Sequence, residues 1–157
     1  MLRSPEHQEV AMRLEPLYRM RFTYPDGWQV GLEGGWQQHL YLLEGRCEGA
    51  VSGRLRGSNY PQRRTEEGPF VPDLRAVVET DDGATVMVEL RGYGRAHPLG
   101  RRQVVASVHH LGDRDPYRRL NDAVCVGVGE VRAQPDGDAG PDLVIDVAEL
   151  VWEPIED

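Results

Sequence analysis

The chain has 157 residues and a mass of 17.7 kDa, which suits one domain and excludes two domains of ordinary size. Its formal charge of −8, from 18 basic and 26 acidic residues, argues against nucleic-acid binding, which depends on a basic surface. All 18 basic residues are arginine, so chemistry that needs an internal lysine Schiff base is excluded.

The first predicted elements are a short helix beginning at Ser4-Pro5-Glu6 and a strand over 12–24. Apolar side chains occupy every even position of the strand, and polar side chains occupy the odd positions except Leu17. A period of two is typical of a strand with one buried face. Pro25-Asp26-Gly27 then predicts a turn, and Gly34-Gly35 and Glu44-Gly45 predict two further breaks. The rest of this half is expected to form three strands, over 28–32, 36–43 and 47–55, followed by a long polar loop over 56–72.

The second half contains the strongest hairpin signal of the sequence. Asp81-Asp82-Gly83 is a tight-turn sequence between strands predicted over 73–80 and 84–93. Asp115-Pro116 predicts the start of a short helical turn through Leu120. The last three strands are expected over 103–111, 123–131 and 143–152.

These elements predict an all-β fold in one domain over residues 1–157. Strands joined by turns, without crossover helices, form an antiparallel sheet. About eight such strands can close into an up-and-down β-barrel that leaves room for side chains or one small ligand. We therefore expect a closed antiparallel up-and-down β-barrel, with a β-sandwich as the alternative.

Seven short stretches, spread over nearly the whole chain, carry a resemblance to one protein family. They are Leu14-Glu15-Pro16-Leu17, Gly34-Gly35-Trp36, Arg54-Leu55-Arg56-Gly57, Asp73-Leu74-Arg75, Thr80-Asp81-Asp82-Gly83-Ala84, Tyr117 to Leu120-Asn121 and Val126-Gly127-Val128-Gly129. In this order they resemble the domain-of-unknown-function family numbered 3237, a family of small bacterial and fungal proteins. The resemblance implies a barrel similar to the allene-oxide-cyclase and dirigent barrels, often paired as a homodimer, and it implies no established activity.

The chain departs from the pattern of that family in two places. Family members usually carry a G-G-x-D-W segment where this chain has residues 58–63, and an F-x-T … F-E-T stretch where it has Val108-His109-His110-Leu111. The ligand of this chain can therefore differ from that of typical members.

Five polar residues are candidate catalytic groups, because the alternation of their strands allows them an internal position. Glu149 shares an otherwise apolar face, where an acid must be paired, protonated or functional. Glu89 and His109 are candidate bases. Asp73 and Arg75 share a face, and Arg75 can hold an anionic or enolate oxygen. The alternatives are an ion pair at the barrel mouth for Asp73 and Arg75, a solvated Glu89, and a lateral arginine partner for Glu149.

Three aromatic residues are candidate ligand-binding walls, with ordinary core packing as the alternative: Trp36, Tyr93 and Tyr60. The histidine and cysteine spacings match no metal site, and no dinucleotide loop is present, so we expect neither metal nor cofactor.

A small-molecule barrel is the function that these residues favour. The first interpretation is a cofactor-independent isomerase, cyclase or lyase acting on a small apolar metabolite in the barrel cavity. A non-catalytic carrier barrel and a dimeric interaction protein without a ligand are the alternatives. Because no apolar run approaches the roughly 18 residues of a membrane span, and the polar start lacks a signal-peptide core, we expect a cytoplasmic protein without a membrane partner.

Overall fold

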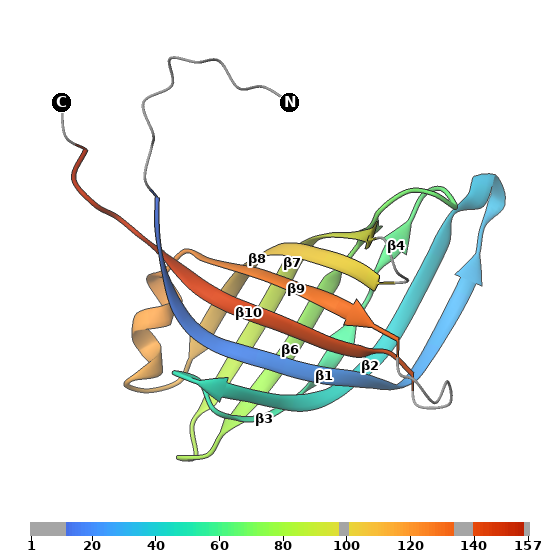
Figure 1. The fold of residues 1–157 in the computed structure, drawn as a ribbon. Helices are drawn as coiled ribbons and strands as arrows, with labels where there is room; N and C mark the ends of the chain where they lie inside the picture. Colours follow the sequence, from blue (N-terminus) through green and yellow to red (C-terminus); the bar gives the residue numbers. More distant parts are fainter. Residues whose placement is uncertain (1–11, 98–100, 134–139, 156–157) are drawn as a thin grey trace.

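The computed structural model describes residues 12–97, 101–133 and 140–155, so the helix expected at Ser4-Pro5-Glu6 lies outside the described residues. Eight of its ten strands form a closed antiparallel ring, in which each strand pairs with the next and the last pairs with the first (Figure 1). They are β1 (Arg13–Gly31), β2 (Gln37–Gly49), β3 (Gly53–Asn59), β6 (Asp73–Thr80), β7 (Thr85–His97), β8 (Arg101–Gly112), β9 (Cys125–Arg132) and β10 (Asp142–Val151). The predicted all-β barrel is confirmed, in place of the sandwich alternative.

Short elements lie at the two ends of the barrel. At one end, β4 (Gln62–Arg63) and β5 (Phe70–Val71) connect β2 to β7, and η1 (Glu33–Gly35) turns β1 into β2 (Figure 1). At the other end, the 3-10 helix η2 (Tyr117–Asp122) covers the barrel with two buried side chains, Tyr117 and Leu120. No helix in the described part of the chain is long and apolar enough to cross a membrane.

The first hairpin is longer than the sequence predicts, because two expected breaks lie inside strands. Pro25-Asp26-Gly27 is part of β1, where the pairing with β2 shifts register between Thr23 and Asp26. Pairing resumes beyond this bulge, so the turn residues bend the strand without ending it. The chain reverses instead at Gly34 and Gly35, whose φ angles of 79° and 84° favour glycine.

The second expected break, Glu44-Gly45, also lies within a strand, β2. A Cβ atom at Gly45 would lie 2.0 Å from the carbonyl oxygen of Arg21 and 2.6 Å from Cα of Phe22. Glycine is needed here because the backbone of the paired strand β1 approaches Gly45 too closely for a side chain, a requirement that looks like a turn signal in the sequence.

The half of the barrel next to η2 is filled by apolar side chains. Inward-facing residues alternate along each strand as a period of two requires. The fully buried core side chains include Met20, Leu55, Val78, Val86, Val108 and Val147. The opposite half is less completely filled and contains the candidate site described below.

One polar pair lies within the filled half. The Tyr18 hydroxyl and His110 Nε2 are hydrogen-bonded at 2.6 Å, and His110 Nδ1 is buried without a hydrogen-bond partner among the described residues. Burial, reinforced by the neighbouring His109, lowers the pKa of His110 from 6.5 to about 4. Folding therefore requires His110 to be neutral.

Acid should destabilise the protein through this histidine. Since the folded pKa is about 4 and the ordinary value is 6.5, unfolding takes up a proton between these pH values, and stability falls as the pH falls. We expect His110 to contribute a loss of about 1.4 kcal/mol per pH unit in this range. Urea unfolding at pH 7, 6 and 5 should show a shallower pH dependence in His110→Gln than in the wild type. Equal slopes in His110→Gln and the wild type would contradict the prediction.

Candidate small-molecule site

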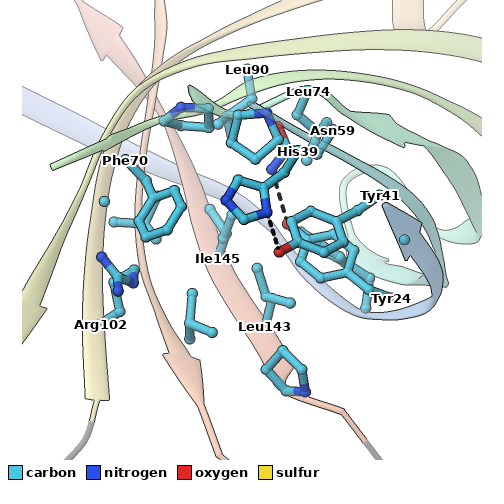
Figure 2. Close-up of a pocket in the computed structure, with 18 of the residues that line it drawn as sticks. Tyr24, His39, Tyr41, Asn59, Phe70, Leu74, Leu90, Arg102, Leu143 and Ile145 are labelled. Carbon is cyan, nitrogen blue, oxygen red and sulfur yellow. Dashed lines mark hydrogen bonds between the residues drawn. The ribbon is translucent and has the colours of Figure 1, made fainter. Parts of the chain in front are cut away.

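A cavity of about 670 Å³ lies in the half of the barrel next to β4 and β5 (Figure 2). This volume is within the range of small-molecule sites. Its walls are mainly apolar, and the aliphatic and aromatic lining includes Phe22, Phe70, Leu74, Leu90, Leu143 and Ile145. A few polar side chains from β1, β2, β3 and β8 interrupt this lining.

His39 is the most buried titratable side chain in the lining, with 5% of its surface exposed. It faces the interior with Tyr41, because residues two apart on β2 share a face. His39 Nδ1 and the Tyr41 hydroxyl are hydrogen-bonded at 3.0 Å, whereas His39 Nε2 is buried with no hydrogen-bond partner among the described residues. Burial, and secondarily the charge of Arg63, lowers the pKa of His39 below 6.5, so the imidazole is neutral at pH 7.

A second tyrosine lies against the first. The Tyr24 ring stacks on Tyr41 with 4.4 Å between centroids (Figure 2). Asn59 Nδ2 donates to the Tyr24 hydroxyl at 2.9 Å, while Asn59 Oδ1 accepts from the backbone N–H of Asp73 at 3.1 Å. These two bonds fix the amide orientation and leave the Tyr24 hydroxyl hydrogen for another acceptor. Burial raises the pKa of Tyr24 to about 12, so the hydroxyl stays a donor at neutral pH.

Arg102 supplies positive charge to the same cavity. Its guanidinium lies over the Phe70 ring, 4.3 Å from the centroid, and Arg63 lies over the same ring at 5.2 Å. Neither arginine has a carboxylate within ion-pair distance among the described residues. Arg63 Nε donates instead to the backbone carbonyl of Thr65 at 2.8 Å.

Four of the five predicted catalytic residues lie together, but on the outer face of the barrel. In the sheet, Glu89 of β7 pairs with Arg75 of β6 on one side and His109 of β8 on the other. Asp73 Oδ1 lies 3.6 Å from Arg75 Nε, and Glu89 Oε1 lies 2.7 Å from Arg91 Nε. The expectation that these residues face the interior is wrong. In each strand the positions next to them point inward, and the buried side chains there are Leu74, Ala76, Val88, Leu90, Val108 and His110.

Three residues of this group, Arg75, Glu89 and His109, border a concavity of about 910 Å³ along β3, β6, β7 and β8. The exposed apolar side chains of Met87 and Leu111 lie beside it. Arg75 and Glu89 are ion-paired at partly or fully exposed positions, as expected for a hydrated sheet surface.

Glu149, the fifth candidate, lies near the η2 end of β10. Its side chain is 20% exposed, and Arg119 Nη1 of η2 donates to its Oε2 at 3.0 Å. Glu149 does not line the cavity. The arginine partner comes from η2, and not from a neighbouring strand.

The three predicted ligand-binding aromatic residues do not line the cavity either. Trp36, Tyr60 and Tyr93 are exposed at 36%, 53% and 54%. The aromatic lining comes from other residues: Phe22, Tyr24, Trp28, Tyr41 and Phe70.

One signal for the observed site is present in the sequence. Tyr24 ends the run of alternating apolar residues in 12–24, and His39 and Tyr41 have the spacing of one strand face. Arg102 has no comparable local signal, because its role depends on Phe70 from a distant segment.

The fold and the cavity define the chain as a closed antiparallel β-barrel with an internal cavity. No family model matches the sequence, and no curated protein matches it. The fold is similar to that of a beta-barrel-like protein from Acinetobacter baumannii, with a TM-score of 0.73 and 20% identity over 93% of this chain and 100% of that one. A conserved protein of unknown function from Rhodopseudomonas palustris has a TM-score of 0.73 and 18% identity, over 90% and 99% of the two chains.

A protein described as an enzyme from Penicillium herquei is also similar. It has a TM-score of 0.69 and 17% identity, over 92% of this chain and 98% of that one. At these identities the likeness concerns the fold alone.

Proposed function

We propose that this barrel binds a small, largely apolar carbonyl compound and moves a proton on it without a cofactor, as an isomerase, cyclase or lyase. The observation that carries the proposal is His39 Nε2, a buried nitrogen with no hydrogen-bond partner in the described part of the chain, in a cavity wall that also holds the Tyr24 hydroxyl. Leaving such a group unpaired costs about 1–3 kcal/mol, and a ligand that interacts with Nε2 from the cavity would reduce this cost. We also propose that the chain is a divergent member of the domain-of-unknown-function family 3237, on the stretches quoted above.

The proposed step uses His39 as a base. In the tautomer with its proton on Nδ1, His39 donates to the Tyr41 oxygen and keeps a lone pair on Nε2. Nε2 takes a proton from the carbon next to the ligand carbonyl, and the C–H electrons move to form an enolate. The Tyr24 hydroxyl donates a hydrogen bond to the enolate oxygen, and the imidazolium returns the proton at the same or another carbon.

A non-catalytic carrier is the second candidate, and the predominantly apolar lining favours it. A carrier would use the same cavity and the same hydrogen bonds without proton transfer. Binding and proton transfer must therefore be measured separately.

Deuterium exchange into 2-tetralone, a ketone fused to a benzene ring with acidic benzylic α-hydrogens, separates the two candidates. In D2O, the proposed enzyme should accelerate loss of the α-proton NMR signals over buffer alone. Binding of 2-tetralone without accelerated exchange would favour the carrier. Neither binding nor exchange would overturn both candidates for this class of ligand.

Filling the cavity should prevent binding. Val131 faces the cavity from β9, whereas Val128 on the same strand faces outward and is 57% exposed. We expect Val131→Trp to weaken binding of prodan, a fluorescent naphthyl ketone, by about tenfold or more, because the indole would occupy ligand volume. The measurement is a fluorescence titration, and Val128→Trp should bind prodan like the wild type. Equal affinities in the two variants would place the ligand outside the barrel.

A further inference from the structure

Arg63 and Arg102, which have no carboxylate partner among the described residues, concentrate positive charge beside the cavity of an otherwise acidic protein. The net charge is −8, and many surface arginines have carboxylate partners, whereas these two lie over one Phe70 ring. Arg102 is half-buried and lines the cavity. A partly desolvated cation without a counterion is costly, so the arrangement is suited to an anion that arrives from outside.

The charge of these two arginines acts to lower the pKa of other residues in the cavity lining. Arg63 lowers the pKa of His39, in addition to the effect of burial, and Arg102 opposes the rise that burial causes in the pKa of Tyr41. Among the described lining residues the acidic one is Asp26, which is exposed and accepts the backbone N–H of Gly27 at 2.8 Å. The charged side chains next to Phe70 are therefore both positive.

We infer that the natural ligand is a flat or elongated apolar compound with one carboxylate, which Arg102 binds while the apolar body fills the cavity. This inference rests on the proposed function, because it assumes that a small molecule occupies the barrel. A guanidinium that lies over an aromatic ring keeps the N–H donors at its edge free for a carboxylate. One cationic side chain lines the described part of the cavity, which matches a singly charged group better than a phosphate. Arg63 adds attraction from its position over Phe70.

Matched neutral and anionic probes test the inference. Isothermal titration with naphthalene-2-carboxylate and naphthalene-2-carboxamide compares the same ring with and without charge. We expect the wild type to bind the carboxylate about tenfold or more tightly than the carboxamide, as a charge-assisted hydrogen bond permits. Arg102→Gln should abolish this preference and leave carboxamide affinity nearly unchanged. Arg95→Gln is the matched control, because Arg95 also lies over an aromatic ring, that of Tyr93, but on the exposed surface.

A salt titration of the wild type tests the same point if Arg102→Gln does not fold. Carboxylate affinity should fall between 0.05 and 0.5 M NaCl while carboxamide affinity stays nearly constant. Equal binding of both probes, lost in Val131→Trp, would overturn the inference and leave the proposed function intact. Failure of both probes to bind would count against the proposed function itself. A carboxylate preference that survives in Arg102→Gln, or that Arg95→Gln abolishes, would overturn the assignment to Arg102.

Discussion

Replacement of His39 by glutamine is expected to slow deuterium exchange into 2-tetralone by about 100-fold or more. General bases typically contribute about 10²–10⁴-fold to the rate of a proton transfer, and glutamine keeps a polar side chain but cannot accept the proton. The buried His39 Nε2 is the proposed acceptor. The measurement is the initial rate of α-proton loss by NMR, at equal occupancy of 2-tetralone in the two proteins.

The pH dependence of exchange distinguishes a base from a structural residue. Since burial lowers the pKa of His39 below 6.5, the wild-type rate should fall toward low pH with a midpoint below 6.5. Protonation of Nε2 removes the lone pair, which explains the sign. His109→Gln, at an exposed position that the sequence favoured, should keep the wild-type rate and profile. A normal rate in His39→Gln, or loss of exchange in His109→Gln, would contradict the assignment.

The second prediction with a large effect concerns the stability of the closed barrel, at the pairing of β7 with β8. Gly92→Ala is expected to lower the free energy of unfolding by about 3 kcal/mol. A Cβ atom at Gly92 would lie 2.0 Å from the carbonyl oxygen of Val105 and 2.6 Å from Cα of Ala106, so β7 and β8 must separate to admit it. Urea unfolding at pH 7 measures the change.

Gly31 provides the matched control for this substitution. Gly31 lies at the exposed end of β1, and a Cβ atom there would meet nothing within 4 Å. Gly31→Ala should change stability by less than about 0.5 kcal/mol. Equal stabilities of Gly92→Ala and Gly31→Ala would show that β7 and β8 are not as closely packed as the closed ring requires.

The period of two in the sequence is sufficient to predict most strands. The strand over 73–80 and the turn after it are confirmed, because local alternation and the Asp-Asp-Gly turn agree with the tertiary pairing. Two turn-like sequences mislead, because the same residue types also occur at bulges and where paired strands approach closely: Pro25-Asp26-Gly27 and Glu44-Gly45. Whether such a sequence ends a strand or lies within one depends on how the strand pairs with its neighbour in the sheet.

The candidate site is harder to predict for the same physical reason. A shift of one residue reverses the face of every side chain in a strand, and this reversal places Arg75, Glu89 and His109 outside. The site itself combines His39, Phe70 and Arg102, which come from three strands far apart in the sequence. No local spacing connects them, so their proximity depends on closure of the barrel.

A crystal structure of the protein with naphthalene-2-carboxylate would test the internal site most directly. The predicted result is ligand density inside the barrel, with the carboxylate beside Arg102 and the naphthalene ring within reach of His39 and Tyr24. Density confined to the outer surface beside Met87 and Leu111, with side chains filling the interior, would contradict it.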